Sequence, residues 1–210
     1  MAVSAGCPQL AAPRPGACSN AGRVYRASKI AGVTLATARL SLRRFTPDDF
    51  ELIFRLHRDP EVTRFLGGVK DRAAAERLMA DRILGYYERH PGFGSWATIE
   101  RATGACVGIH VLNHIQGETI VQIGYILFRE YWGRGYATEM AEPLLRYGFV
   151  DLGVPRIAGI TDLDHVVSQR VLQKIGLERR ADRTFPHPAY AGHGPFAFFD
   201  RDAASWLARA

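Results

Sequence analysis

The chain has 210 residues, 47% of them hydrophobic, which is enough to bury the core of one domain. Its formal net charge of +6 is unevenly spread, because residues 1–44 hold 7 Lys or Arg and no acidic residue, whereas residues 45–210 hold 20 basic and 21 acidic residues. The larger part is therefore nearly neutral, which argues against a nucleic-acid-binding surface.

The N-terminal 33 residues are rich in Ala, Gly, Pro and Ser, so we expect a disordered extension over 1–33 and a single domain over 34–210. An Arg-bearing, acid-free start is also typical of an organellar transit peptide. No segment reads as a membrane span. The cysteines Cys7, Cys18 and Cys106 lack metal-type spacing and fit a reducing cytoplasm without a disulfide scaffold.

Strands and helices alternate in the predicted domain. Thr46 is expected to cap a helix with Pro47 at its first position. Phe50, Ile53, Phe54 and His57 recur at helical spacing along its predicted buried face. The other predicted elements are strands at 38–44, 95–100, 106–114, 119–128, 156–161, 177–183 and 195–200, and helices at 71–87, 138–149, 166–175 and 201–208.

The most distinctive motif is the run YWGRGYATE, residues 131–139, between a predicted strand and a predicted helix. Gly133 and Gly135 permit a tight turn and leave backbone N–H groups unobstructed by Cβ atoms. The first amides of the next helix lack intrahelical acceptors, and the helix dipole adds partial positive charge. This combination predicts an anion cradle for a phosphate or pyrophosphate, with Arg129 and Arg134 at its rim.

Several interpretations of this glycine run compete, including a plain turn that binds nothing. A dinucleotide site needs G-x-G-x-x-G/A directly after a strand, but Thr138 takes the third small position and residues 128–132 intervene. A P-loop needs a Gly-Lys-Ser/Thr triplet, which the sequence lacks. An acyl-coenzyme A pyrophosphate site is the third interpretation.

Four stretches around the run lie in order: LSLRRFTPDD at 40–49, DPEV at 59–62, GY at 124–125 ahead of YWGRGYATE, and SQRVLQKIGL at 168–177. Together they resemble the GNAT acetyltransferase superfamily over about residues 37–208. The likeness is closest to the subgroup that includes the ribosomal-protein-alanine N-acetyltransferases. Four matches in register favour the acyl-coenzyme A interpretation over the dinucleotide one.

The resemblance implies an α+β, three-layer α/β/α fold with a mixed, mostly antiparallel twisted sheet of about six to seven strands. Its central strands splay, so that the strands at 106–114 and 119–128 part from the strand at 156–161. Backbone groups left unpaired there need partners, which the amide-rich pantetheine arm of acetyl-CoA would supply. The implied cofactor-binding residues are Ile126 and Leu127 through their main chain, Trp132, Gly133, Arg134, Gly135, Tyr136, Ala137, Thr138, His165, Ser168 and Lys174.

The resemblance is weaker at the catalytic positions. The Glu often found before Ile-Gly-Tyr is Gln122, the Tyr that many members use as general acid falls at Leu172, and an Asn is replaced by His165. Ser168 is the implied hydroxyl for the departing thiolate, with a helix-surface serine as the alternative. His110 and His114 share one face of a strand and titrate near neutral pH, so either is a candidate base, or an ordinary packed histidine.

The loop FPHPAYAGHG at 185–194 lies where the resembled family borders its acceptor site, so His187, Tyr190 and His193 are candidate substrate-binding residues. An ordinary surface hairpin is the alternative. We expect a cytoplasmic, acetyl-CoA-dependent N-acetyltransferase acting on a protein N-terminus or a small-molecule amine, as a monomer or homodimer. No metal, nucleic acid or membrane is expected as a partner. A non-catalytic acyl-CoA sensor or interaction module is the alternative function.

Overall fold

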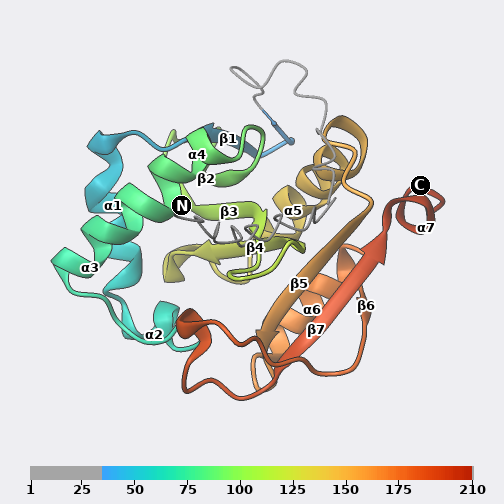
Figure 1. Ribbon diagram of the computed structural model, residues 1–210. Coiled ribbons are helices and arrows are strands. Elements are labelled where there is room, and N and C mark those ends of the chain that lie inside the picture. Colours follow the sequence, from blue (N-terminus) through green and yellow to red (C-terminus); the bar gives the residue numbers. More distant parts are fainter. Residues whose placement is uncertain (1–34, 210) are drawn as a thin grey trace, which may run out of the picture.

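A computed structural model describes residues 35–209, which form a seven-stranded sheet flanked by helices (Figure 1). The predicted extension at 1–33, with Cys7 and Cys18, lies outside the described residues. The strand order is β1-β2-β3-β4-β5-β7-β6, and every pairing is antiparallel except β4 with β5. The strands are β1 Leu40–Arg44, β2 Gly94–Glu100, β3 Cys106–His114, β4 Val121–Leu127, β5 Arg156–Asp162, β6 Glu178–Arg179 and β7 Phe196–Asp202.

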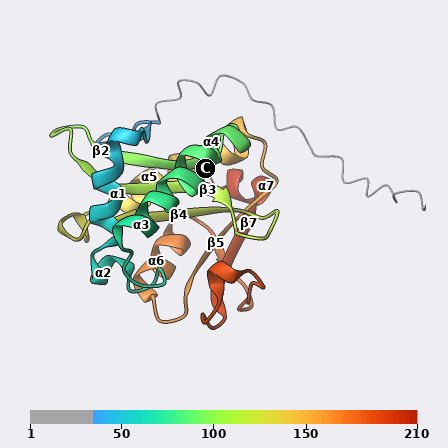
Figure 2. The same cartoon turned by 60° about the vertical axis from the view of Figure 1, so that its left-hand side comes forward.

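Helices cover both faces of this sheet, as the predicted α/β/α layering requires. Figures 1 and 2 show α1 to α4 grouped over the β1–β4 part, and α6 beside β5 and β7. The helical elements are η1 Pro47–Asp49, α1 Phe50–His57, α2 Pro60–Thr63, α3 Arg72–Arg77, η2 Leu78–Leu84, α4 Gly85–Arg89, η3 Arg129–Tyr131, α5 Tyr136–Arg146, η4 Tyr147–Asp151, α6 Val166–Lys174, η5 Pro188–Tyr190 and α7 Ala203–Leu207. The mixed, mostly antiparallel sheet is thus confirmed.

The two larger of three apolar clusters lie on opposite faces of the sheet, because successive strand residues point to opposite sides. On one face, Leu112 and Ile123 pack against Met140 and Leu144 of α5. On the other face, the predicted buried residue Ile53 packs in a second cluster with Leu56, Met79, Ile83, Ala97 and Ile109. The helices α1 and α5 therefore hold the central strands from the two sides.

The strands β4 and β5 separate soon after they meet. Their parallel pairing consists of Val121 with Ile157 and Gln122 with Ala158. β4 continues to Leu127, fully paired with β3 on its inner side, while its outer edge diverges from β5. The predicted splay of the central strands is confirmed, and it leaves backbone groups on the outer edge of β4 without a neighbouring strand.

Several predicted elements have different bounds in the structure. The helix predicted at 71–87 is a continuous α3-η2-α4 unit with a π-helical middle. The short helix α2 was not expected; it forms because Asp59 accepts hydrogen bonds from the backbone of Glu61 and Val62. The strand predicted at 177–183 was too long, since the ladder with β7 stops at Arg179 and returns only as a single bridge at Arg183.

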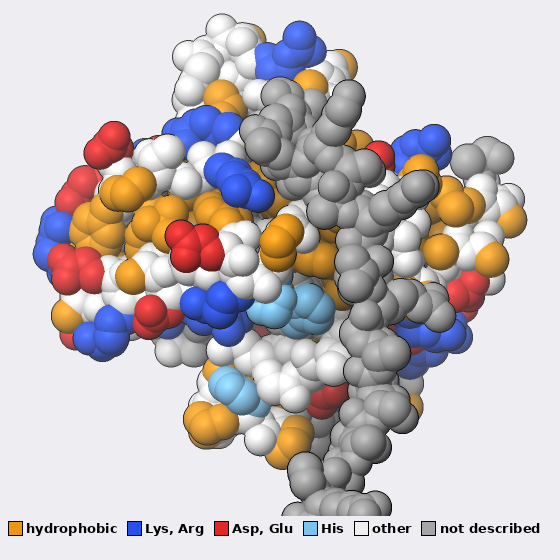
Figure 3. All heavy atoms as spheres, turned by 45° about the horizontal axis from the view of Figure 1, so that its top comes forward, with side chains coloured by type: hydrophobic (Ala, Val, Ile, Leu, Met, Phe, Trp, Pro, Cys, Tyr) orange, Lys and Arg blue, Asp and Glu red, His pale blue; other side chains and the backbone are white. Residues whose placement is uncertain are grey.

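Charges of both signs are interspersed on the face seen in Figure 3, with no extended area of one sign among the coloured side chains. This agrees with the near-neutral balance of residues 45–210. Within residues 35–209, no helix has the length and apolar character needed to cross a membrane.

Candidate active site

The glycine run forms a sharp turn at the start of α5. Gly133 and Gly135 have φ of +74° and +78°, a region that favours glycine. A Cβ on Gly133 would meet no atom within 4 Å, so the turn is open on that side. The first hydrogen bond of the helix runs from the Glu139 N–H to the Gly135 carbonyl at 3.0 Å. The amides of residues 136–138 precede it and have no acceptor within the helix.

Trp132 and Tyr136 border this turn in different ways. Trp132 is 48% exposed, and its indole N–H donates to the Leu127 carbonyl at 2.8 Å. Tyr136 is buried, stacks on Tyr131, and donates its hydroxyl to the Glu100 carboxylate. The predicted cradle residues Arg134, Ala137 and Thr138 lie on the same turn and the first helical turn. Trp132 therefore connects the turn to the end of β4, and Tyr136 connects the start of α5 to the end of β2.

Tyr125 connects β4 to α6. Its hydroxyl donates to the Ser168 carbonyl at 2.9 Å and lies 3.3 Å from Ser168 Oγ. Burial raises the pKa of Tyr125 well above its ordinary value, so the hydroxyl stays protonated at neutral pH. Ser168 is half-buried in the first turn of α6. Two hydroxyl groups therefore meet between β4 and α6.

His165 lies at the N-terminal end of α6, where the predicted site places it. Its ring stacks on Phe65 with centroids 4.1 Å apart and planes 14° apart, and its Nδ1 lies 3.2 Å from Thr161 Oγ1. Burial lowers the pKa of His165, which favours the neutral ring. The loop between α2 and α3 therefore touches the start of α6. Lys174, in contrast, is exposed in the last turn of α6.

The candidate acceptor loop packs against two other loops. Tyr190 accepts a hydrogen bond from the Gln116 N–H at 3.2 Å, and the His187 ring lies against Gly117, so this end contacts the β3–β4 turn. At the other end, His193 Nδ1 lies 3.9 Å from Asp162 Oδ1 at the end of β5. The structure brings His193 and His165 toward the same end of β5, and leaves His187 and Tyr190 at the hairpin turn.

The two candidate bases on β3 have different surroundings, and the centroid of the His110 ring lies 6.1 Å from that of the Tyr125 ring. His110 is 0% exposed, with Nδ1 2.7 Å from Thr98 Oγ1 and Nε2 3.2 Å from the Ala137 carbonyl. Burial lowers its pKa to about 4, so the ring is neutral at physiological pH. Its ring packs beneath the first turn of α5, where it supports the cradle. His114 is half-buried, bonded to Tyr86 and next to His90; burial and His90 lower its pKa.

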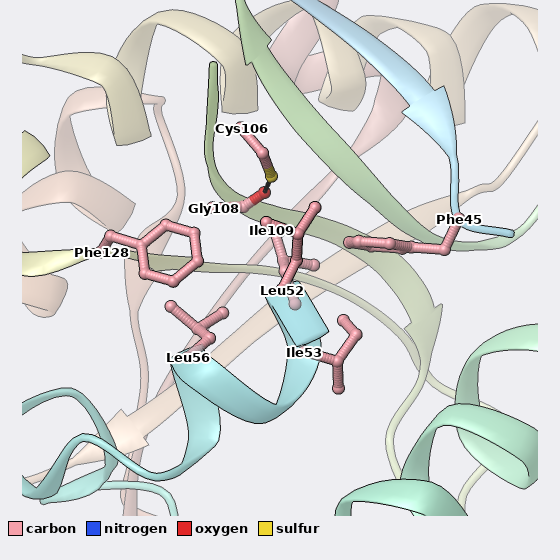
Figure 4. A pocket seen from close by; sticks show the side chains of 8 residues that line it. All are labelled: Phe45, Leu52, Ile53, Leu56, Cys106, Gly108, Ile109 and Phe128. Atoms are coloured by element: carbon pink, nitrogen blue, oxygen red, sulfur yellow. Dashed lines mark hydrogen bonds between the residues drawn. The ribbon is translucent and has the colours of Figure 1, made fainter. Parts of the chain in front are cut away.

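A small apolar hollow lies between α1 and the β3–β4 strands. Figure 4 shows its lining side chains, which include Cys106 beside the Gly108 carbonyl. Burial raises the pKa of the Cys106 thiol, which disfavours the reactive thiolate. Its lining holds no ionisable side chain other than Cys106. Among residues 35–209, no cluster of three His, Cys, Asp or Glu residues is placed to hold a metal ion.

Sequence reasoning missed three contacts at the site. Tyr125 was noted within a motif but not as a site residue, and its period-two position on β4 is the only signal it gives. Phe65 and Arg39 give no local signal, because they reach the site from segments distant in the chain. Arg39 donates to the Arg134 carbonyl inside the glycine turn at 3.0 Å.

The sequence is similar to those of known proteins. Residues 39–178 match the family model described as an acetyltransferase (GNAT) domain. The N-acetyltransferase YoaA of Bacillus subtilis, itself uncharacterised, is 32% identical over 149 residues, which cover 69% of this chain and 82% of that protein.

Solved structures share the fold at lower identity. A protein from Vibrio cholerae described as a putative ribosomal-protein-serine acetyltransferase has a TM-score of 0.65 and 22% identity, with 81% of this chain and 97% of that chain covered. Spermidine N-acetyltransferase from Vibrio cholerae, solved with CoA and spermine, has a TM-score of 0.64 and 14% identity, with 81% and 99% covered.

Proposed function

The chain belongs to the GNAT acetyltransferase family and is an acyltransferase, and we propose that it moves an acetyl group from acetyl-CoA to a primary amine. The observation that carries the proposal is the open glycine turn at the start of α5, directly beside the outer edge of β4 that diverges from β5. The turn suits a pyrophosphate, and the strand edge suits an amide-bearing arm.

Each part of the donor has a matching part of the site. The amides of residues 136–138 and the Arg134 side chain suit the pyrophosphate. The main chain of Ile126 and Leu127 suits the pantetheine arm, once the Trp132 indole releases the Leu127 carbonyl that it occupies in this structure. His165 and Ser168 lie at the start of α6, across the splay from β4, and suit the thioester end.

The reaction is a direct transfer. The neutral amine attacks the thioester carbonyl, the C–N bond forms, the C–S bond breaks, the amine loses a proton and the thiolate gains one. Ser168 Oγ, with the Tyr125 hydroxyl 3.3 Å away, is the proposed hydrogen-bond donor to the leaving sulfur. Because burial raises the pKa of Tyr125, the Tyr125 hydroxyl stays protonated beside Ser168 at neutral pH.

A protein or peptide N-terminus is the acceptor that the site favours. Freeing an α-amine of its proton near neutral pH costs about 1 kcal/mol, against about 5 kcal/mol for a lysine amine, so water suffices as the proton acceptor. His110 is buried and Gln122 occupies the usual Glu position, which fits a site without a strong base. Exposed apolar side chains lie close in sequence to Phe65 and His165, at Leu66, Val69, Leu163, Val166 and Val167. They suit an apolar peptide end better than a polycation.

An acceptor screen tests this proposal. Purified protein with acetyl-CoA should release thiol only when an amine is added, and more rapidly with peptides bearing an apolar first residue than with spermidine or free lysine. Thiol release that needs no amine would contradict direct transfer to an acceptor.

The alternative is a non-catalytic acyl-CoA sensor. This alternative is favoured by Gln122 and Leu172, which stand where many family members have Glu and Tyr. CoA binding without thiol release across the whole amine panel would support this alternative and overturn the enzymatic one.

A further inference from the structure

The segment that leads into β1 reaches across to the start of α5. Thr37 Oγ1 donates to Glu139 Oε1 at 2.6 Å, and the Arg39 backbone N–H donates to the same oxygen at 3.1 Å. Arg39 Nε donates to Glu139 Oε2 at 2.7 Å. One carboxylate in the first turn of α5 therefore fixes both the backbone and the side chain of a segment 100 residues away.

Glu139 is well suited to hold this position. Its side chain is 19% exposed. Burial alone would raise the pKa of the Glu139 carboxyl, but hydrogen bonds from Thr37 and Arg39 bring it below its ordinary value. The group is therefore ionised at neutral pH and keeps the Arg39 guanidinium in one orientation.

Arg39 also donates a hydrogen bond to the glycine turn. Its Nη2 donates to the Arg134 carbonyl at 3.0 Å, and its guanidinium carbon lies 4.6 Å from the centre of the Tyr136 ring. The Arg134 carbonyl and the Gly135 N–H belong to one planar trans peptide, in which the two groups point in opposite directions. By holding that carbonyl, Arg39 fixes the direction of the Gly135 N–H.

The segment that carries Arg39 is itself held in place. The Arg101 N–H donates to the Arg39 carbonyl at 2.8 Å, and Arg101 Nη1 donates to the Thr37 carbonyl at 2.8 Å. The support therefore runs from the β2–β3 turn through residues 37–39 to the cradle, so the geometry of the turn does not depend on the run 131–139 alone.

We infer that Arg39, oriented by Glu139, is a positioning residue that sets the phosphate-binding geometry of the Gly133–Gly135 turn. The inference rests on the proposed acetyl-CoA site. It extends that site to a residue far outside the glycine motif, and it assigns the pair an effect on the phosphate-bearing part of the donor alone.

Two donors separate this role from a general structural one. Acetyl-CoA carries the pyrophosphate, and acetyl-pantetheine has the same thioester without it. In Arg39→Ala, KM for acetyl-CoA should rise about 10- to 100-fold with kcat almost unchanged, while KM for acetyl-pantetheine stays at the wild-type value. Arg39→Lys should still show a raised KM for acetyl-CoA, because an ammonium group lacks the forked guanidinium geometry that reaches Glu139 and Arg134 together.

The matched control is Arg72→Ala, which removes another half-exposed arginine paired with a glutamate, Glu51, at 2.8 Å. It should leave both KM values unchanged. If Arg39→Ala folds poorly, Glu139→Gln, which keeps the size of the side chain, should raise KM for acetyl-CoA in the same selective way. Equal rises for both donors, or no rise for either, would overturn the inference.

The failure of the proposed function would look different, since the wild type would then turn over neither donor. In that case, titration with CoA and with pantetheine decides the role of Arg39. Arg39→Ala must weaken CoA binding and leave pantetheine binding unchanged, and any other pattern contradicts the inference.

Discussion

Two hydroxyl groups with different surroundings meet between β4 and α6. Tyr125 is held by burial and by the Ser168 carbonyl, whereas Ser168 Oγ is half-buried at the start of α6. Ser168→Ala should therefore lower kcat by about 10- to 100-fold, the effect of one hydrogen bond to a developing charge, with little change in KM for acetyl-CoA. Steady-state kinetics with both substrates measures the two constants.

Ser205→Ala is the control for that substitution, because Ser205 is exposed near the C-terminus, in α7. It should retain the wild-type kcat. A Ser168→Ala enzyme with unchanged kcat would remove Ser168 from the chemistry and shift the role of donor to Tyr125.

His110 makes folding stability depend on pH. Its pKa is about 4 in the folded protein and about 6.5 in an unfolded chain. Below about pH 6.5 the unfolded state binds more protons, so stability falls as the pH drops toward the folded value. This residue should contribute a loss of about 2 kcal/mol between about pH 7 and about pH 5.

Urea unfolding at the two pH values measures that loss in the free energy of unfolding. His110→Gln should flatten the pH dependence by this amount, whatever it does to stability at neutral pH. An unchanged slope would show that the ring is hydrated enough to take up a proton in the folded state.

The outer edge of β4 is the element on which the proposed acetyl-CoA site depends. Residues 123–127 extend beyond the pairing with β5, so outward-facing amides there should exchange with solvent readily. CoA should slow exchange in this segment and in the first turn of α5, while β7, paired on both sides by β5 and β6, stays the same. Hydrogen exchange with mass spectrometry resolves these segments. Protection elsewhere, without protection of β4, would place the ligand at another site.

Local sequence patterns predicted those helices and strands that are determined by residues close together in the chain. The cradle helix follows from two glycines and a helical period, although it begins at Tyr136 because Gly135 precedes it in a left-handed conformation. The strand at 177–183 was overestimated, since its apolar start gives no sign that the ladder ends after two residues. The roles of Tyr125 and Arg39 depend on partners 43 and 95 residues away, and no local period encodes such distances.

At the scale of the whole molecule, the sheet order brings the parts of the site together. β4 lies in the middle of the sheet, and its C-terminal end precedes the glycine turn. Its outer edge faces the start of α6, where β4 and β5 have separated. The family resemblance predicted this arrangement, including the layers and the splayed strands. The resemblance could not show that His110 lies under α5, because burial depends on packing between elements that are distant in the sequence.

Calorimetric titration with CoA tests the central claim, that the Gly133–Gly135 turn holds the phosphates of an acyl-CoA. Gly135→Val adds a β-branched side chain at φ +78°, at a cost of about 1–3 kcal/mol of backbone strain. Gly153→Val is the matched control, with φ +65° and open space around it just after η4. The wild type and Gly153→Val should bind one CoA per chain, and Gly135→Val should not. Equal CoA affinity in all three proteins would contradict the claim.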